Sequence, residues 1–423
     1  MGGRLLAPTK LSVAQRLMLS SGGLSVSRRF SSVFALGFWA LAAALSSPCA
    51  SADSSPVDLN AAAKSVVRVA QVKQNQVILL TSDPTNFPFL EDLAVAVRSL
   101  GAFPLIWVTS DNYNERMYSE VPSTYDSQSP LLLLGLYKMI DTQINVDYGG
   151  AQDYNFFAVA DQNRLAAQSK AGTVALQEFL SSNRRYVEVG NGIFPNAPNA
   201  SLIGVSQTAL ADTFWTAMNA DYTKVEANAN AIKSTIAGAT TMRVTNPNGT
   251  DLTFGVKDTR FIVSAGSISP DCAGINCYAA LPAGDLFVIP VPGTASGKVV
   301  FDNTFWGKDL LKGLTATFKA GKLVSMTSSS DMTKVNAAYS AGGEGRDAFS
   351  IVDIGVNDAA KDIPGSLMLA TFAGGSVTLG WGGDIGYGGT NSSPFGFSGT
   401  QPGSTVTVDG KTIIANGAIA TNM

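Results

Sequence analysis

Apolar positions in the first half of the chain alternate between runs of strand length and stretches of helical spacing. Residues 77–81 form a strand-length apolar run, and turn residues follow at 82–84. Over residues 89–101, leucine, alanine and valine recur at spacings of three and four until a glycine ends the pattern, which predicts a helix. Residues 105–108 form the next strand-like run. A strand, a helix and a strand in this order predict a parallel sheet with helices on its faces.

The same alternation continues through the rest of the first half. Apolar runs at 130–140 and 156–159 precede an alanine-rich stretch of helical spacing at 162–180. We therefore predict an open α/β domain. No glycine-rich turn follows the first predicted strand, so the sequence does not support a dinucleotide site there.

The pattern changes in the second half of the chain. Residues 208–236 have helical spacing and predict a linker helix, after which short alternating strands such as 252–256 and 314–318 are interrupted by Gly, Asn and Asp. A chain of 423 residues exceeds the usual size of one hydrophobic core. We predict an α/β domain with a parallel sheet over residues 53–240 and a mostly β (α+β) domain over residues 241–423.

The start of the chain has the pattern of a signal peptide. Basic residues precede an apolar run at 33–45, and Ala50 and Ala52 flank Ser51 as a small-residue cleavage site. The apolar run is too short to span a membrane. We expect residues 1–52 to be removed by cleavage near Ala52, which leaves a periplasmic or secreted protein without a stable membrane span.

Composition and charge narrow the possible partners. Charged residues make up 14% of the chain, against about 25% in ordinary soluble domains, and the net charge is −3. A chain with so few charges and a slightly negative net charge offers no basic surface for the phosphate backbone of a nucleic acid. We therefore expect no nucleic acid as a partner.

The chain contains no histidine, which removes the side chain that titrates near neutral pH and the commonest neutral metal ligand. Ser-His-Asp triads, His-bound zinc and His general bases are excluded together. No Gly-x-Ser-x-Gly motif is evident, and a Ser or Cys nucleophile would lack an imidazole base. These templates predict no catalytic residue.

Two cysteines remain once Cys49 leaves with the signal peptide. Cys272 and Cys277 lie in one short polar segment, and an even pair in an oxidising compartment predicts a disulfide on a surface loop. A zinc site is the alternative. It fits less well, because two thiolates without histidine leave most of a tetrahedral shell unfilled.

Short motifs in the second half follow one another in an order known from one protein family. Residues 249–253 read Gly-Thr-Asp-Leu-Thr, and residues 281–290 resemble a Leu-Pro-x-Gly-Glu-Val-Phe-x-x-Pro segment. The further matching segments are 297–302, 314–323, 388–393 and 408–413. Together they resemble the thermophilic aminopeptidase T family of metallopeptidases over most of residues 242–417. The resemblance implies that family's two-domain fold and, by analogy, a homodimer that pairs through the C-terminal halves.

The resemblance also implies where the family's metal ligands fall. In that family two metal ions are held by two Glu, two His and one Asp, and they activate the water that attacks a peptide carbonyl. The first Glu falls on Asp285, a shorter carboxylate. The second falls on Ile351 in the most natural register, with Asp347 and Asp353 close by in sequence.

The family's histidine positions carry residues of different chemistry. The first His falls on Met368, whose thioether suits copper(I) rather than a hydrolytic metal. The closing His-x-Asp motif falls on Gly396-Phe397-Ser398, so neither of its ligands is present. The resemblance thus implies a metal centre that has been largely dismantled.

Two functional hypotheses remain. In the first, the protein is a non-catalytic family member without a cofactor, and its old cleft binds a small peptide or another small molecule. The glycine-rich residues 382–391 lead into the metal site in the family, so this stretch and its neighbours are expected to line the cleft. The expected ligand-binding residues are Met368, Asn391, Ser393, Phe397 and Ser398.

In the second hypothesis, the protein is an active metal-dependent aminopeptidase or hydrolase. A divalent metal would then lie in a rebuilt site of Asp285, Asp347 and Asp353, unless these are ordinary strand-end carboxylates. Ring-opening dioxygenases share the fold but also hold iron with histidine, so the missing residues count against them equally. Convergence of the three carboxylates with Asp384 would favour the metal site, and their separation would favour the first hypothesis.

Overall fold

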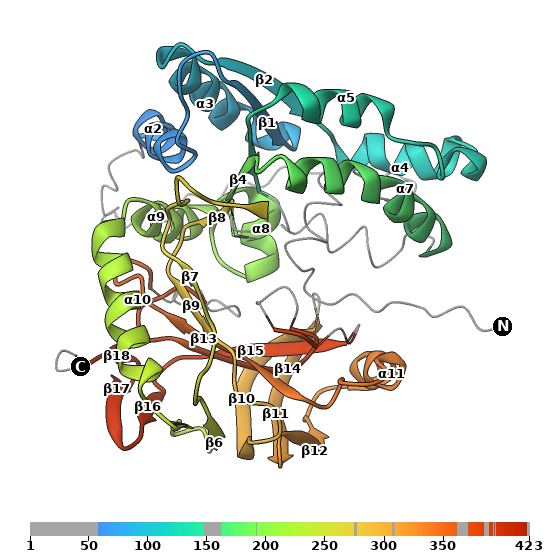
Figure 1. Cartoon of the computed structure of the whole chain (residues 1–423). Coiled ribbons are helices and arrows are strands. Elements are labelled where there is room, and N and C mark those ends of the chain that lie inside the picture. The colour runs from blue at the N-terminus through green and yellow to red at the C-terminus, as the bar shows by residue number, and fades with distance from the viewer. Residues whose placement is uncertain are drawn as a thin grey trace, which may run out of the picture.

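A computed structural model describes the chain from residue 58 to residue 420 with short gaps (Figure 1). The described residues are 58–147, 162–191, 193–274, 277–306, 309–361, 371–384, 389–391, 393 and 395–420. The expected signal peptide, the apolar run at 156–159 and Met368 lie outside them.

The N-terminal half is built on a five-stranded parallel sheet, as the sequence predicts. Its strand order is β2-β1-β3-β4-β8, and all four pairings are parallel. The strands are β1 (Val77–Ser82), β2 (Phe103–Val108), β3 (Thr142–Val146), β4 (Arg185–Val189) and β8 (Tyr278–Leu281). The last of these comes from far along the chain, so a strand of the second half completes the first sheet.

Helices cover both faces of the parallel sheet (Figure 1). Alternate residues of β1 point to opposite faces, so Ile78 and Leu80 join one apolar cluster and Leu79 joins another. The first cluster is covered by α2 (Leu59–Val69), α3 (Phe87–Ser99), α8 (Ala197–Ile203) and α9 (Gln207–Met218). The second is covered by α5 (Leu131–Met139) and α7 (Gln162–Ser181). Near β2 the chain also forms η1 (Pro84–Asn86), α4 (Asp111–Glu120) and η2 (Ser123–Tyr125).

The predicted linker helix at residues 208–236 is two helices, α9 and α10 (Tyr222–Ala237). The chain breaks between them because Asp221 caps the second helix, where its carboxylate accepts a hydrogen bond from the Thr223 N–H at 3.0 Å. Helical periodicity runs across the break, so it does not reveal the cap.

The C-terminal half is mostly antiparallel β, as the sequence predicts. One sheet has eight strands in the order β12-β11-β10-β6-β5-β16-β17-β18, and the other has five in the order β15-β14-β13-β9-β7. The first comprises β5 (Thr241–Thr245), β6 (Asp251–Gly255), β10 (Ser296–Trp306), β11 (Asp309–Lys319), β12 (Lys322–Thr327), β16 (Thr405–Val408), β17 (Lys411–Ala415) and β18 (Ala418–Ile419). The second comprises β7 (Phe261–Ser264), β9 (Asp285–Val288), β13 (Phe349–Gly355), β14 (Val377–Gly382) and β15 (Gly396–Gln401).

The C-terminal core lies between these two sheets and includes the inner faces of α10 and α11 (Thr333–Ala341). Its centre is aromatic: the rings of Trp381 and Phe397 stack with centroids 4.8 Å apart, and Trp306 stacks on Phe397 at 5.9 Å. Burial of such rings is among the largest single contributions to stability, roughly 1.5–3 kcal/mol for a side chain the size of Phe. One face of the five-stranded antiparallel sheet therefore packs into this core.

Cys272 and Cys277 form the predicted disulfide, with an S–S distance of 2.14 Å. Among the described residues, none of the helices is both long and apolar enough to span a membrane.

Candidate functional site

The second face of the five-stranded antiparallel sheet carries polar residues beside apolar ones such as Ile351 and Phe287, and β13 shows how this arises. Val352 and Ile354 point into the C-terminal core, so Ile351 and Asp353 point to the opposite side, because side chains alternate along a strand. Across the ladder Asp353 pairs with Phe287 of β9 and with Thr378 of β14. Asp353 is only 2% exposed.

Asp285 lies on the same face as Asp353. It is the first residue of β9, where it pairs with Gly355 of β13 on one side and with Ser264 of β7 on the other. Since directly paired residues share a face, Asp285 and Asp353 are diagonal neighbours on adjacent antiparallel strands, a separation of about 7–8 Å. Asp285 is 4% exposed, so two carboxylates are buried side by side.

Hydroxyl groups surround this pair of carboxylates. Thr378 and Thr400 are joined by a hydrogen bond of 2.8 Å between their hydroxyl oxygens, and Ser398 lies two residues from Thr400 on the same strand face. The Ser264 Oγ is shielded from solvent and makes no hydrogen bond. We call Ser264, Asp285, Asp353, Thr378, Ser398 and Thr400 the polar face. None of the five strands that form it contributes a basic residue to it.

The backbone before Asp285 is held tightly in place. Gly284 has φ +144°, and a Cβ on it would lie 2.5 Å from the Cβ of Asn357. The Asn357 Nδ2 donates to the carbonyl of Ala283 at 2.8 Å, and the Val356 N–H donates to that of Gly284 at 2.7 Å. These contacts fix the entry of β9 and therefore the position of Asp285.

The other two candidate carboxylates lie away from the polar face. Asp347 lies in the turn that precedes β13, so it stands beyond the start of the strand, whereas Asp353 lies near the end of the strand that pairs with Asp285. Its carboxylate oxygen lies 3.8 Å from the Nζ of Lys322. Asp384 follows β14 at the end that pairs with the start of β13, which is also remote from Asp285. The four carboxylates therefore do not converge.

Asp384 and Asn391 hold each other within the glycine-rich segment. The Asp384 N–H donates to the Asn391 carbonyl at 3.0 Å, and the Asp384 Oδ1 accepts from the Asn391 N–H at 2.7 Å. Burial raises the pKa of the Asp384 carboxyl, against the opposing effects of the Asn391 N–H and the charge of Arg260. These bonds join the described residues Asp384 and Asn391 of the segment.

Two of the expected ligand-binding residues use their side chains to anchor this segment. The Asn391 Nδ2 donates to the carbonyls of Gly345 and Gly382 at 2.8 and 2.7 Å. The Ser393 Oγ donates to the Gly342 carbonyl at 2.9 Å and accepts from the Phe395 N–H at 3.2 Å. The structure thus places Asn391 and Ser393 between β14 and the turn that precedes β13, and it does not bring them to the polar face.

The remaining candidates divide between the two faces of β15. Phe397 points into the aromatic core and is 2% exposed, so its side chain does not lie on the polar face. Ser398, the next residue, does lie on that face. Sequence reasoning missed Ser264, Thr378 and Thr400, because nothing in their local sequence separates a hydroxyl on this face from any other strand hydroxyl.

The most recognisable family motif stabilises the fold rather than the site. The Thr250 Oγ1 accepts from the Val300 N–H at 2.9 Å and from the Gln401 Nε2 at 2.9 Å. The Asn248 Nδ2 donates to the Val300 carbonyl at 2.7 Å. The Gly-Thr-Asp-Leu-Thr signature therefore joins β6 to β10 and β15.

The carboxyl ends of the parallel strands point toward the five-stranded antiparallel sheet (Figure 1). Only Pro282, Ala283 and Gly284 separate β8, in the parallel sheet, from β9, in the antiparallel one. The carboxyl edge of the parallel sheet is closed by a hydrogen-bonded network around Asp147, which follows β3. The Asn199 Nδ2 donates to the Asp147 Oδ1 at 2.7 Å. The amides of Asn86 and Asn196 donate to its Oδ2.

Comparisons with known proteins agree with this architecture. A model of the family described as thermophilic metalloprotease (M29) matches residues 57–340, which include Asp285 but end before β13. The structure of AmpT from Thermus thermophilus is similar with a TM-score of 0.63 and 17% identity, covering 86% of this chain and 99% of that chain.

A second solved structure has the same fold but carries the name of another activity. The 2,5-dihydroxypyridine dioxygenase from Pseudomonas putida matches with a TM-score of 0.56 and 11% identity, again over 86% of this chain and 99% of that chain. No curated protein matches the sequence. At these identities the structural likeness shows the fold alone.

Proposed function

Since the chain belongs to the thermophilic metalloprotease (M29) family, we propose that it keeps this family's fold but binds a small peptide through the peptide's ammonium group and does not cleave it. The observation that carries the proposal is the composition of the polar face. Its carboxylates are Asp285 and Asp353, its other polar groups are hydroxyls, and the sequence contains no histidine.

The polar face does not fit the two metal ions implied by the family. Such a centre uses several carboxylate and imidazole ligands to hold two ions about 3.5–4 Å apart. Within the described residues, no group of three or more His, Cys, Asp or Glu side chains is placed to hold a metal ion. Asp347 and Asp384, which a rebuilt site would need, lie at the opposite end of β13. We derive no catalytic step through a metal here.

Electrostatics favour a cationic ligand group at this face. An ammonium group bound between Asp285 and Asp353 would form charge-assisted hydrogen bonds with both carboxylates. A peptide ammonium supplies one charge and three N–H donors, which matches two carboxylates and a neighbouring hydroxyl such as Ser264. The hydroxyls of Thr378 and Thr400, which are hydrogen-bonded to each other at 2.8 Å, would bond to the peptide's amide groups. This chain's residues would thus bind and orient the ligand.

Calorimetric titration with alanyl-alanine and with N-acetyl-alanyl-alanine tests the proposal. Because acetylation removes the positive charge, we expect the free dipeptide to bind at least tenfold more tightly than the acetylated one. Asp285→Asn should reduce affinity for the free dipeptide by roughly tenfold or more, since it removes one charge-assisted hydrogen bond.

Asp347→Asn is the matched control, because the same substitution beyond the opposite end of β13 should leave affinity unchanged. Equal binding of the free and acetylated dipeptides would overturn the ammonium proposal. Release of alanine from either dipeptide by the purified protein would overturn the non-catalytic one and favour the metal-dependent hydrolase.

We also propose that the mature protein is exported and begins after Ala52. The basic start, the apolar run at 33–45 and the small residues around Ser51 support this. Intact-mass measurement of the protein recovered outside the cytoplasm should give a chain that starts near residue 53. A cytoplasmic protein with an intact N-terminus would contradict it.

A further inference from the structure

One segment of the chain crosses between the two halves of the molecule twice. After β7 the chain leaves the five-stranded antiparallel sheet and enters the parallel sheet as β8. It then returns to the antiparallel sheet as β9. We call the described residues of this segment, 265–274 and 277–284, the strap. Asp285 follows it directly, so the strap connects the parallel sheet to the polar face.

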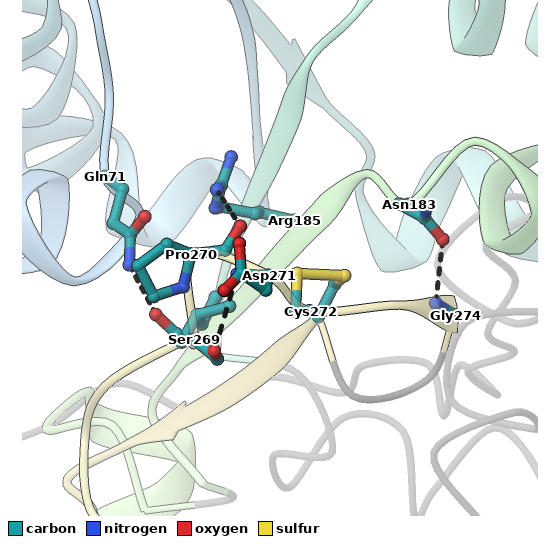
Figure 2. The surroundings of a disulfide bond; sticks show 10 residues. Gln71, Asn183, Arg185, Ser269, Pro270, Asp271, Cys272 and Gly274 are labelled. Atoms are coloured by element: carbon teal, nitrogen blue, oxygen red, sulfur yellow. Dashed lines mark hydrogen bonds between the residues drawn. A yellow bond between two sulfur atoms is a disulfide. The ribbon is translucent and has the colours of Figure 1, made fainter.

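The first part of the strap is hydrogen-bonded to the N-terminal half (Figure 2). The Gln71 Nε2 donates to the carbonyl of Ile268, and the Arg185 Nη2 lies 3.5 Å from that of Pro270. The Gly274 N–H donates to the Asn183 Oδ1 at 3.0 Å. The bonds made by Arg185 and Asn183 are exposed to solvent, whereas Ile268, which accepts from Gln71, is buried in the N-terminal core.

The second part of the strap is β8, a four-residue strand at the edge of the parallel sheet. The Tyr186 N–H donates to the Cys277 carbonyl at 2.8 Å, and the rings of Tyr186 and Tyr278 stack at 5.7 Å. The Tyr278 hydroxyl donates to the buried Glu188 carboxylate. This short edge strand has one neighbour only, and its residues Ala279, Ala280 and Leu281 are buried.

The Cys272–Cys277 disulfide joins these two parts. Cys277 is buried and directly precedes β8, whereas Cys272 is partly exposed and follows the loop that bonds to Gln71 and Arg185. The covalent bond makes the loop contacts and the strand pairing open together rather than one by one. The protection of the β8 amides from hydrogen exchange therefore depends on the disulfide.

We propose that the strap is a redox-sensitive tie: the oxidised Cys272–Cys277 pair keeps β8 in the parallel sheet, and its reduction releases β8. Reduction adds two electrons and two protons. The Sγ–Sγ bond breaks, each sulfur becomes a thiol, and a dithiol reductant is oxidised to its own disulfide. Cys272, the more exposed sulfur, is the one that the incoming thiolate attacks. The tie does not depend on what the polar face binds.

Hydrogen exchange of the mature protein before and after treatment with dithiothreitol tests the tie. We expect the amides of β8 and of Gly190, whose N–H donates to the Leu281 carbonyl at 2.7 Å, to exchange at least tenfold faster after reduction. The amides of β10 and β11, which pair far from the strap, should keep their rates. Unchanged exchange of β8 in protein whose two thiols are shown free by alkylation would overturn the proposal.

Two variants separate the disulfide from its surroundings. The double substitution Cys272→Ser and Cys277→Ser should exchange like the reduced protein and should not respond to dithiothreitol. Asn183 has φ +51°, which glycine adopts readily, so Asn183→Gly removes the bond to Gly274 without forcing the backbone and should keep β8 protected while the disulfide stays intact. If the double variant does not fold, reduction of the wild-type protein followed by re-oxidation remains decisive, because β8 protection must fall and then return.

Discussion

The two faces of the five-stranded antiparallel sheet differ in chemistry, although they are formed by neighbouring residues of the same strands. On one face Trp381 and Phe397 stack at 4.8 Å within a closed apolar core. On the other, Asp285 and Asp353 lie side by side among hydroxyls. A single step along β15, from Phe397 to Ser398, passes from one face to the other. The core face is constrained by packing, so the scaffold can persist while the opposite face changes its chemistry.

The largest effect is expected on the core face. Trp381→Ala removes the largest fully buried side chain and should lower the free energy of unfolding by about 3–5 kcal/mol. Trp381→Phe keeps most of the contact area with Phe397 and Phe318 and should cost clearly less. Urea unfolding followed by far-ultraviolet circular dichroism gives both values. A loss below about 1 kcal/mol for Trp381→Ala would contradict the assignment of this face as core.

On the polar face, we expect a substitution to change ligand affinity more than it changes the free energy of unfolding. Asp353→Asn keeps the shape of the side chain but removes one of two neighbouring charges, so we expect roughly tenfold weaker binding of alanyl-alanine. Its effect on the free energy of unfolding should be smaller than that of Trp381→Ala. Calorimetry and urea unfolding of the same preparation compare the two effects. A variant that loses stability as Trp381→Ala does, yet binds normally, would show that Asp353 is structural.

The smallest effect concerns Asp384, whose pKa is raised by burial. As pH rises, the unfolded chain loses this proton before the folded protein does. The protonated side chain therefore contributes most at pH values below the usual pKa of an aspartate, and the contribution is lost as pH rises through the folded-state pKa. Asp384→Asn, which stays neutral, should be more stable than wild type near neutral pH, with the difference shrinking as the pH is lowered. Urea unfolding over that range checks this. A difference that does not change with pH would contradict it.

The architecture was largely predictable because it depends on local periodicity. The strand–helix–strand alternation around residues 77–108 predicts the parallel sheet, and the short alternating runs beyond residue 241 predict the β-rich half. β8 was not predictable in the same way. Its four residues carry no strong pattern, and its partner β4 lies about ninety residues earlier in the chain.

The site was less predictable because it depends on register. Asp285 and Asp353 are far apart in sequence and become neighbours only through the antiparallel pairing of β9 with β13. Every residue of β13 is buried, so alternation of burial does not reveal which face is polar. The motif places Phe397 in the cleft because it stands between two ligand positions, but alternation along β15 turns it into the core. Asn391 and Ser393 lie within the motif because the glycine-rich loop needs them as anchors.

The strap adds a link between the two halves that neither sheet reveals alone. The same chain segment completes the parallel sheet and delivers Asp285 to the polar face within a few residues. The fold is shared with proteins named as AmpT and as a dioxygenase, so the fold by itself does not determine the chemistry. The side chains on the polar face must decide it.

Elemental analysis of the purified mature protein is the most direct test of the central claim that this face no longer holds metal ions. The protein should be expressed with zinc, iron, manganese and cobalt in the medium and then dialysed without chelator. We expect each metal well below one equivalent per chain, because Asp285 and Asp353 are the only carboxylates among the described residues of the polar face. One or two equivalents of any of these metals, lost in Asp285→Asn, would contradict the claim and restore the metal-dependent hydrolase.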